Sequence, residues 1–579
     1  MALQNKDISK LSLPKVKYAS ATKAEQSKSS QVEVFVKNKN TAAIIMPFNR
    51  DLLDKFKYEI DGRKWNGEEK YWEFPIVHLP AVFKLFGKEN IKCDEAVIKA
   101  LAKLTERRVE LDEIRVQDDT EFAIPGMKIQ PYPYQKVGVQ FVDRAGGRCL
   151  IADAPGLGKT MQAIAYAQLH NLKTIIVCPL SVVLNWKREI KKFTGKNATI
   201  WDSKSYEGKL SNQFHIVHYD AVGKVVSDLR KQDFDLLVCD EATYLKNRQT
   251  IRAKSILGSY KERRKYPGIK TKYCIFLTGT PVMSRPIEAF SLLNFLDNQR
   301  FNNFFHFTQR YGGWKGEPAK NLKDLHERTK DLVIRRKKEE VLTELPSKQR
   351  NELYVELNKE ENRTYGELLK EMFGKWKLEG KPSVQHMPKL QGFLIDKKLP
   401  RVIELIDEFL DNDRPILIFS CYIAPLKKLL EHYKDQSVIL TGEMNKDKRQ
   451  ASIDALTSGK AKIGLFSLKA AGMGIDGLQH VMDTVVFLDM DWVPANHEQA
   501  EDRTHRIGQT NKVQIYYMIC EGTIDEYIRD ILREKQEIAS MIVDGQSLQL
   551  NTNKSFFKEF VVKINSAYNE LFAAENVVE

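Results

Sequence analysis

Two short segments that lie far apart in the chain carry the residue types of a nucleotide-hydrolysing site. Residues 152–160 read Ala-Asp-Ala-Pro-Gly-Leu-Gly-Lys-Thr, and residues 499–509 read Gln-Ala-Glu-Asp-Arg-Thr-His-Arg-Ile-Gly-Gln. The first segment is suited to hold phosphate groups. The second offers Arg503 and Arg506, whose spacing of three predicts that both lie on one helical face. Neither segment is a complete ATPase site, so the fold must bring them together, and hydrolysis is expected to depend on how two lobes close.

The first segment has the parts of a phosphate-binding loop but departs from the usual pattern at its first position. Its glycines allow backbone N–H groups to approach the phosphates, its lysine would reach the β- and γ-phosphates, and the threonine hydroxyl would ligate Mg²⁺. An aspartate stands where a glycine is usual. A glycine-rich turn before an ordinary helix is the alternative, but the preceding apolar strand and the following helix favour nucleotide binding. The expected ATP-binding residues are Asp153, Gly156, Leu157, Gly158, Lys159 and Thr160.

An acidic pair follows a second apolar strand. Asp240 and Glu241 come directly after Leu-Leu-Val-Cys at 236–239. A carboxylate at the end of a strand is well placed for Mg²⁺, and its neighbour could orient or deprotonate water. Such a pair alone is commonly a solvated turn, but together with the phosphate loop it predicts ATP and Mg²⁺ as ligands.

The strands and helices around these residues follow an α/β pattern in two stretches. Short apolar strands alternate with helices before residue 300 and again after residue 400, which predicts two mostly parallel sheets flanked by helices. Residues 300–395 between them are charged and helix-prone. The predicted strands are 149–151, 174–178, 215–218, 236–239 and 273–277 in the first stretch, and 416–419, 438–440, 463–466, 484–488 and 513–518 in the second.

The N-terminal part of the chain has a different pattern. Residues 42–86 are rich in aromatic and basic side chains and alternate between strand and helix, which predicts a small α+β module. We therefore expect a flexible basic tail at 1–30, the α+β module at 31–90, a connecting segment at 91–117, an ATP-binding lobe at 118–300, a helical insert at 301–395, a second lobe at 396–545 and a C-terminal helical extension at 546–579.

Charge and cysteine usage narrow the class of protein. The formal net charge is +14, which suits a polyanionic partner, although a basic surface that merely aids solubility is equally compatible with it. The 7 cysteines form no CxxC pair, and several lie in apolar runs, so we expect neither zinc nor disulfides and an intracellular setting. Because no apolar run is long enough to cross a bilayer, no membrane partner is expected.

Five motifs, two of which contain the acidic pair and the segment 499–509, follow one another in order along the chain. They are CPLSVVLNWKREIKKF (178–193), DEATYLKN (240–247), LTGTPVMSRPIEAFSLLNFL (277–296), SLKAAGMGID (467–476) and DWVPANHEQAEDRTHRIGQ (491–509). This series resembles the motifs of the Swi/Snf-related ATPases of helicase superfamily two. The resemblance spans roughly residues 130–530. It implies two RecA-like lobes and ATP-driven translocation on duplex DNA, generally without processive strand separation.

The resemblance also implies roles for individual residues of the ATP site. Gln135, within PYPYQKVGVQF, would recognise adenine. The acidic pair would hold Mg²⁺ and act as the catalytic acid–base group. Thr278 and Thr280 would couple the nucleotide state to the grip on DNA. Arg503 and Arg506 would act as arginine fingers.

The residues expected to face DNA are fewer. The resemblance implies that Lys469 and Trp492 face the duplex, and Lys187 is a further candidate from its position beside Trp186. Trp186 itself is expected to anchor the core. The basic run 335–338 could line the DNA path or form a solvated helix face.

Three positions depart from the family pattern. Thr243 stands in place of histidine, Val493 in place of asparagine, and Asp476 in place of asparagine. None of the three is a residue that hydrolysis requires, so an active ATPase is still expected.

The N-terminal module resembles the HARP domain of annealing helicases, which re-pair complementary DNA strands. Trp72 and Phe74 are two residues apart, share one face of a strand and are expected to build the core. This would leave Arg63, Lys64 and Lys70 for DNA. The matching positions are Phe48, Leu52, Phe56, Lys57, Lys64, Trp65 and residues 70–74.

These observations lead to one expected function and two alternatives. The expected function is an ATP-driven translocase on double-stranded or branched DNA that remodels or re-anneals it as a monomer, in a bacterial or viral-host cytoplasm rather than a nucleus. One alternative is an ATPase that displaces protein from duplex DNA or remodels it during transcription. The other is a DNA-binding scaffold that does not hydrolyse ATP.

Overall fold

The computed structural model describes residues 31–203, 205–259, 265–279, 285–313, 317–379, 387–472 and 475–545. The chain divides into two compact units, Met1–Glu106 and Arg107–Glu579. The tail expected at 1–30 and the extension expected at 546–579 lie outside the described residues, as does Thr280. Among the helices that are described, none combines the length and the apolar character needed to cross a membrane.

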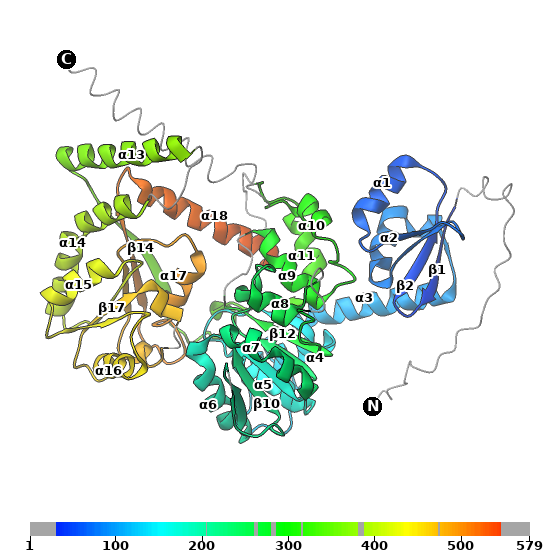
Figure 1. The fold of residues 1–579 in the computed structure, drawn as a ribbon, viewed down its shortest axis with the longest axis horizontal. Coiled ribbons are helices and arrows are strands. Elements are labelled where there is room, and N and C mark those ends of the chain that lie inside the picture. Colours follow the sequence, from blue (N-terminus) through cyan, green and yellow to red (C-terminus); the bar gives the residue numbers. More distant parts are fainter. Residues whose placement is uncertain are drawn as a thin grey trace, which may run out of the picture. The chain divides into compact units, whose positions relative to one another are not determined.

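A five-stranded mixed sheet forms the centre of the first unit, drawn in blue in Figure 1. The strand order is β3-β4-β2-β1-β5; β1 and β5 are parallel, and the other neighbours are antiparallel. Its elements are β1 (Val32–Asn38), β2 (Thr41–Ile45), α1 (Arg50–Glu59), β3 (Lys64–Asn66), β4 (Tyr71–Pro75), α2 (Leu79–Phe86) and β5 (Ile91–Cys93). Helix α3 (Glu95–Arg115) follows and continues into the second unit.

The core of this first unit is aromatic. Phe56 of α1 and Phe74 of β4 are buried, and their ring centroids lie 6.2 Å apart. Trp72 packs against the same Phe56 ring at 6.1 Å, so the prediction that Trp72 and Phe74 line the core is confirmed. Strand β5 lies in the part expected to be a connecting segment, because its short Ile-Lys-Cys run becomes a strand only by pairing with β1.

The second unit begins with a lobe built on an eight-stranded sheet, which we call lobe 1. The strand order is β13-β6-β12-β11-β7-β10-β8-β9, parallel except for the β8–β9 pair. The strands are β6 (Arg148–Ile151), β7 (Thr174–Cys178), β8 (Ala198–Trp201), β9 (Tyr206–Glu207), β10 (Phe214–His218), β11 (Leu236–Cys239), β12 (Tyr273–Leu277) and β13 (Val333–Ile334). The helices are α4 (Pro133–Arg144), α5 (Lys159–Leu169), α6 (Val183–Thr194), α7 (Tyr219–Leu229), α8 (Ile251–Leu257), α9 (Pro286–Leu296), α10 (Phe304–Tyr311), α11 (Leu322–Thr329) and α12 (Lys338–Val341).

Both faces of this sheet are covered by helices. Ile175 and Val177 of β7 belong to one buried cluster, whereas Ile176 and Cys178 belong to the other. Successive side chains of a strand point to opposite faces, so β7 must be apolar at every position. This explains why the central strands were recognisable as unbroken apolar runs.

The rest of the second unit forms lobe 2 around a six-stranded parallel sheet with the order β14-β19-β18-β15-β17-β16. The strands are β14 (Lys348–Val355), β15 (Ile416–Ser420), β16 (Ser437–Leu440), β17 (Ile463–Ser467), β18 (Thr484–Phe487) and β19 (Val513–Cys520). The helices are α13 (Lys359–Glu379), α14 (Met387–Asp411), α15 (Ile423–His432), α16 (Lys446–Thr457), α17 (Pro494–Glu501) and α18 (Ile524–Asp544).

The segment 301–395, expected to be a helical insert, also contributes a strand to each sheet. Strand β13 pairs with β6 in lobe 1, and β14 pairs with β19 in lobe 2. The first of these strands has only two residues. The second is a partly exposed edge strand that mixes charged and apolar residues, and it therefore lacks the apolar run typical of a buried parallel strand. Every strand that was predicted for the two lobes is present, whereas β8, β9, β13 and β14 were not predicted.

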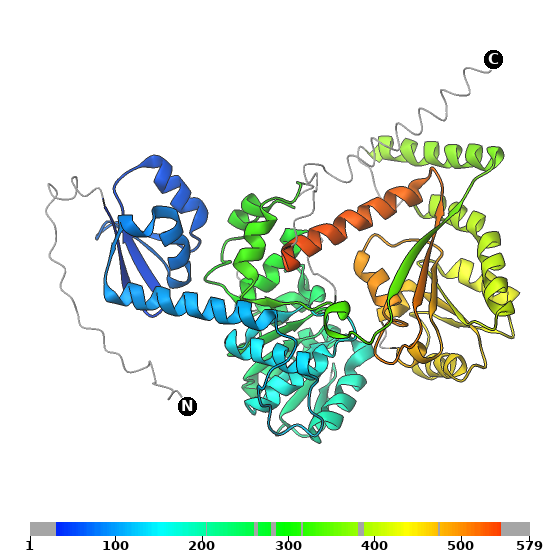
Figure 2. The same ribbon diagram turned by 180° about the vertical axis from the view of Figure 1, so that it is seen from behind.

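Helix α18 belongs to the cores of both lobes. Figures 1 and 2 show it running from lobe 2 to the helices of lobe 1. Ile524 and Ile528 pack in a cluster of lobe 2, whereas Ile538 and Ile542 pack in a cluster of lobe 1. The carbonyl of Ile542 also lies 3.0 Å from Nδ1 of His326 in α11. The two lobes are therefore joined by a continuous apolar element as well as by the chain between β13 and β14.

Candidate ATP site and inter-lobe cleft

The phosphate loop connects β6 to α5 in lobe 1. Gly156 and Gly158 have φ angles of 88° and 72°, which side chains with a Cβ rarely adopt. A Cβ at Gly158 would also collide with Nε2 of Gln135. The first turn of α5 directs its unpaired N–H groups toward the loop, and Nζ of Lys159 donates to the carbonyl of Asp153 at 2.8 Å. The loop has the backbone geometry of a phosphate cradle, and Gln135 lies beside it.

The buried side chain of Asp153 supports the phosphate loop from the protein interior. Its carboxylate is fully buried and forms an ion pair with Arg336, whose Nε lies 3.1 Å from Oδ1. Gln162 of α5 donates to Oδ2 at 2.9 Å. The aspartate that replaces the usual glycine therefore fixes the start of the loop with its side chain, while its carbonyl accepts from the Lys159 ammonium.

Asp240 and Glu241 end β11 at the same edge of the sheet. Trp186 donates from Nε1 to Oδ2 of Asp240 at 2.8 Å, and the Glu241 amide donates to Oδ1 at 3.0 Å. Glu241 has a left-handed backbone with φ 50°, which turns the chain sharply after the strand. Burial raises the pKa of Asp240, and burial together with the Asp240 carboxylate raises the pKa of Glu241 to about 7. A carboxylate with such a pKa is suited to accept a proton near neutral pH.

Lobe 2 brings three side chains to this edge. Gln499 of α17 donates from Nε2 to Oε1 of Glu241 at 3.2 Å. A Cβ built on Gly156 would lie 3.6 Å from Cβ of Arg506, so Arg506 is next to the phosphate loop. Arg503 is half-buried, and its Nη1 donates to the carbonyl of Ile475 at 3.2 Å. The two distant segments from which the site was predicted meet in the folded chain.

The two arginines do not lie on one helical face, and this expectation was wrong. Helix α17 ends at Glu501, so both residues are in the irregular turns that follow. The hydroxyl of Thr504 donates to the Glu501 carbonyl at 3.0 Å and competes with the helical hydrogen bond. Gly508, with φ 98°, then redirects the chain. The turns nevertheless direct Arg506 to the phosphate loop.

The surroundings of Arg503 favour the binding of an anion. Burial, and secondarily the charge of Arg506, lowers the pKa of Arg503 to about 9. Its Nε is buried and has no hydrogen-bond partner among the described residues. Arg506 pairs with Asp476 at 3.0 Å. A phosphate group near these side chains would relieve the repulsion between the two guanidinium groups.

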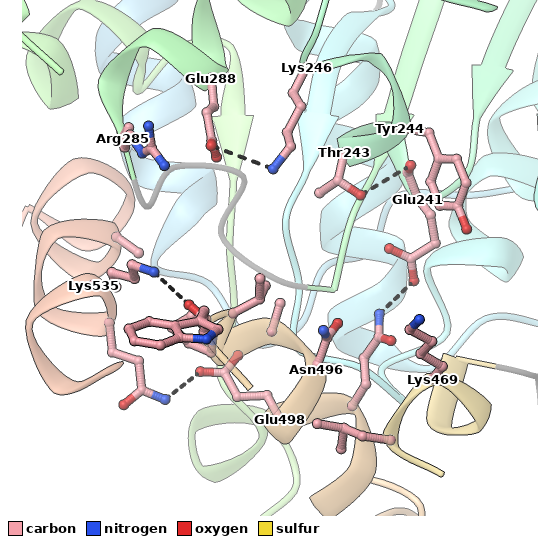
Figure 3. A pocket seen from close by; sticks show the side chains of 18 of the residues that line it. Glu241, Thr243, Tyr244, Lys246, Arg285, Glu288, Lys469, Asn496, Glu498 and Lys535 are labelled. Carbon is pink, nitrogen blue, oxygen red and sulfur yellow. Dashed lines mark hydrogen bonds and ion pairs between the residues drawn. The ribbon is translucent and has the colours of Figure 1, made fainter. Parts of the chain in front are cut away.

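A pocket of about 810 Å³ lies between the lobes and reaches Glu241, which follows β11 (Figure 3). Lobe 1 contributes Glu241, Lys246 and Arg285, and lobe 2 contributes Lys469 and Trp492, the two residues expected to face DNA. Burial, and then the positive charge of Arg285, lowers the pKa of Lys535 on α18 to about 8. The pocket is thus rich in cations and shares Glu241 with the ATP site.

Two family comparisons agree with this arrangement. Residues 134–399 match the SNF2-related domain, and residues 397–508 match the helicase conserved C-terminal domain. The chain belongs to the SNF2-related ATPases. The N-terminal sheet precedes both matched ranges.

Individual relatives of this SNF2-related ATPase are similar at lower coverage of their own length. An uncharacterized ATP-dependent helicase of Mycoplasma pneumoniae is 31% identical over 74% of this chain and 44% of that protein. The DNA annealing helicase and endonuclease ZRANB3 of Homo sapiens is 28% identical over 75% of this chain and 42% of its own length. The SWI/SNF-related matrix-associated actin-dependent regulator of chromatin subfamily A-like protein 1 of Xenopus tropicalis is 29% identical over 85% and 53%. This chain therefore spans about half the length of the curated relatives it matches.

One solved structure is also similar. The Sulfolobus solfataricus SWI2/SNF2 ATPase core in complex with dsDNA is 25% identical and covers 77% of this chain and 99% of that chain, with a TM-score of 0.37. At this score the two chains superpose poorly as wholes, so the family assignment of this SNF2-related ATPase stands on the sequence matches.

The basic run 335–338 of this SNF2-related ATPase is not a solvated helix face, and one of its residues, Arg335, lines the inter-lobe pocket. Arg336 and Lys338 are 3% and 4% exposed and pair with Asp153 and Asp502. Arg335 pairs with Asp544 of α18 at 3.3 Å. Arg336 and Lys338 can be buried because each pairs with a carboxylate, the first in lobe 1 and the second in lobe 2.

The remaining predicted residues have distinct surroundings. Trp186 is 1% exposed, which confirms a core position, and Lys187 pairs with Glu207 at 2.6 Å outside the pocket lining. Thr278 is fully buried. Among the departures from the family pattern, Asp476 pairs with Arg506, while Thr243 and Val493 line the pocket.

Four functional side chains were missed or misread from the sequence alone. Gln499 is the first residue of the segment 499–509 that carries the two arginines, but nothing in the sequence connects this glutamine to Glu241. Trp186 was expected only as core, yet its indole N–H holds Asp240. Arg336 and Lys338 were visible as a basic run, and only their buried partners reveal what they contact.

Proposed function

We propose that this SNF2-related ATPase is a DNA-dependent motor that moves on double-stranded or branched DNA and remodels or re-anneals it. ATP would be hydrolysed between the two lobes. The observation that carries the proposal is the shared position of Glu241, which accepts a hydrogen bond from Gln499 of lobe 2 and also lines the cationic inter-lobe pocket. Contacts made by DNA in the pocket can therefore reach the group that acts on water.

The chemistry divides among the residues of the cleft. Glu241 would orient the attacking water and accept its proton, because burial raises its pKa toward neutrality. Lys159 and Arg506 would bind the transferred phosphoryl group from opposite lobes, where developing negative charge is stabilised by preorganised cations. Arg503 would support the same charge from behind.

The residues present fit Mg²⁺–ATP. The described residues contain no cluster of three or more metal-ligating side chains, and Mg²⁺ in phosphoryl-transfer sites is typically held by one or two protein groups together with substrate phosphates and water. Asp240 is a partly buried carboxylate whose pKa is raised by desolvation, and a bound cation would relieve that cost. Thr160 and Asp240 would hold the ion, which when bound neutralises charge on the phosphates.

The finer part of the proposal, action on branched DNA, draws on the N-terminal unit and the relatives. A relative named as a DNA annealing helicase is 28% identical over 75% of this chain. The unit also exposes aromatic side chains, among them Phe48 at 89% and Trp65 at 52%, and Arg50 and Lys64 lie close to them in the sequence. Exposed aromatic rings can stack on unpaired bases, which occur where a duplex branches.

The test is ATP turnover measured with no DNA, single strands, linear duplex and forked junctions. We expect turnover to rise with duplex and most with forks, and Glu241→Gln to bind ATP without hydrolysing it. Turnover indifferent to every DNA would refute a DNA-dependent motor. Preference for protein-coated duplex over forks would instead favour a displacing ATPase, and no turnover under any condition would favour a scaffold.

The arginine finger role has its own test. Arg506→Ala should leave ATP affinity nearly unchanged and abolish hydrolysis, because the guanidinium contributes to the transition state rather than to the bound substrate. Affinity is measured with a fluorescent ATP analogue and hydrolysis by phosphate release. Loss of affinity in parallel with hydrolysis would contradict the role.

A further inference from the structure

One chain segment touches both halves of the ATP site. Residues 334–350, here called the strap, leave the sheet of lobe 1 at β13 and enter the sheet of lobe 2 at β14. The strap carries the basic run 335–338, and its buried cations find carboxylates on both sides of the cleft.

The first part of the strap is bound to the phosphate loop. The Ala152 amide donates to the Ile334 carbonyl at 2.7 Å, and the Ala154 amide donates to the Arg336 carbonyl at 3.0 Å. The Arg336 side chain then bonds Asp153, and its Nη2 donates to Oε1 of Gln162 at 2.7 Å. The strap is therefore in fixed register with the loop that would hold phosphate.

Two residues further on, the strap is bound to residues 501–506 of lobe 2, here called the arginine segment. Nζ of Lys338 lies 2.7 Å from Oδ1 of Asp502, directly before Arg503, and donates to the carbonyl of His505, directly before Arg506. A Cβ built on Gly156 would lie 3.6 Å from Cε of Lys338, the same separation as from Cβ of Arg506. Lys338 therefore lies beside both the phosphate loop and the residue expected to reach across to it.

The far end of the strap strengthens the same attachment. Arg350 makes a bidentate pair with Glu501, with Nε at 2.7 Å and Nη2 at 2.6 Å, and Lys348 pairs with Glu501 at 2.9 Å. Nε2 of His505 lies 2.8 Å from the Pro346 carbonyl. The segment from Glu501 to Arg506 is thus held by the strap at several points.

Buried ion pairs are a poor source of net stability, because desolvation offsets their attraction, and their best-attested use is to specify one register. Two residues of extended chain reach only about 7 Å, so Arg336 and Lys338 tie the phosphate loop and the arginine segment at a nearly fixed separation. The charged groups facing Lys338 are Asp502, Lys348 and Arg506, so its ammonium is matched by one carboxylate and needs that partner.

We propose that Lys338 is a positioning residue for ATP hydrolysis, which holds the turn bearing Arg503 and Arg506 against the phosphate loop. The proposal rests on hydrolysis in this cleft. Without Lys338 the turn loses the strap contact nearest the phosphate loop and keeps those at Glu501 and His505, so Arg506 reaches the transferred phosphoryl group in fewer molecules. Nucleotide binding by the phosphate loop itself remains, because Arg336 still anchors Asp153.

The first measurement separates positioning from binding. In Lys338→Met, kcat with duplex DNA should fall on the order of 100-fold, the cost of misplacing a reacting group by about 1 Å, while affinity for a fluorescent ATP analogue changes little. Lys338→Arg keeps the charge and should recover part of kcat. An ATP affinity that falls as far as kcat would make Lys338 a nucleotide ligand and overturn the proposal.

The second measurement does not require activity. Hydrogen exchange of backbone amides in 502–509 should become faster in Lys338→Met, whereas amides in 153–160 should keep wild-type rates. If the methionine variant does not fold, Lys338→Gln replaces it. Unchanged exchange in 502–509 would overturn the proposal, and it would do so whether or not the wild-type protein proves to be a DNA-dependent motor.

A matched control distinguishes positioning from general stability. Lys398 and Asp525 form an equally buried pair at 2.8 Å inside lobe 2, away from the cleft. Lys398→Met should lower thermal stability without changing kcat of the folded protein or exchange in 502–509. Equal losses of kcat in the Lys398 and Lys338 variants would show that Lys338 acts only through stability.

Discussion

At the level of single residues, each carboxylate of the candidate ATP site is held in place by hydrogen-bond donors of the surrounding protein. Asp240 is held by the indole of Trp186 and by the Glu241 amide, and Asp153 by Arg336 and Gln162. These hydrogen bonds occupy the carboxylate lone pairs that face the protein core. The orientation of each carboxylate is therefore set before a ligand arrives, which is the condition for preorganised catalysis.

Trp186→Phe tests this view at Asp240. The phenyl ring keeps the apolar contacts but cannot donate, so Asp240 loses a hydrogen bond of about 1.5–3 kcal/mol, which corresponds to roughly a 10- to 100-fold lower kcat if the contact holds the productive geometry. Steady-state ATP turnover with duplex DNA measures it. Trp201→Phe is the matched control, because Trp201 is also buried and donates to His215 at 3.0 Å in the same lobe. Equal effects of the two changes on kcat would show that only core packing matters.

At the scale of elements, α18 and the strap join the lobes by different means. Helix α18 contributes apolar side chains to both cores, and hydrophobic contact is non-directional, so it tolerates small rotations of one lobe against the other. The strap uses directional ion pairs that specify one arrangement. We expect the helix to keep the lobes together and the strap to determine when the site is assembled.

The position of Lys535 on α18 predicts a pH-dependent grip on DNA. Its pKa is lowered to about 8, so the ammonium is charged below that value and neutral above it. DNA affinity should weaken as the pH rises through about 8, with the salt dependence losing roughly one phosphate contact. Lys535→Arg stays charged, so its affinity should not show this step. Fluorescence anisotropy with duplex DNA at fixed ionic strength measures both proteins, and identical pH profiles would contradict the assignment.

At the scale of the whole molecule, the chain combines an ATPase of two lobes with a separate N-terminal sheet. The sheet is complete only with β5, because β5 pairs with β1 at the edge opposite β3. Its hydrophobic cluster also includes Val97 and part of the first turns of α3. Any truncation designed at residue 90 would therefore leave an unpaired strand on the remaining protein.

Deleting residues 1–94 removes the whole sheet and tests what the N-terminal unit adds. We expect the truncated protein to retain ATP turnover stimulated by linear duplex, because the family matches begin at residue 134, and to lose its preference for forks. Turnover on both DNAs, compared with the full chain, measures this. A companion variant, Trp65→Ala in the full chain, should reduce the preference for forks in the same direction. An unchanged preference in the truncated protein would place fork recognition in the ATPase lobes.

Some residues of the candidate site were predictable from the sequence and others were not, for identifiable reasons. The phosphate loop and the acidic pair were found because their function needs particular residues at fixed local spacing. Arg503 and Arg506 were also found, but their helical placement was wrong because Thr504 and Gly508 end the helix in a way that periodicity does not reveal. The buried pairings of Arg336 and Lys338 in the basic run 335–338 were not predicted, because charge alone does not tell whether a cationic side chain meets water, DNA or a buried aspartate.

The alternation of apolar strands and helices, the two α/β lobes and the chemical groups of the candidate ATP site could be predicted from the sequence, since these depend on local composition and short spacing. Only the tertiary structure decided which groups meet. Contacts such as Gln499 with Glu241, Trp186 with Asp240 and Lys338 with Asp502 join residues far apart in the chain. Their formation depends on how sheets and lobes pack, because the partner of a buried charge is chosen by three-dimensional proximity rather than by position along the chain.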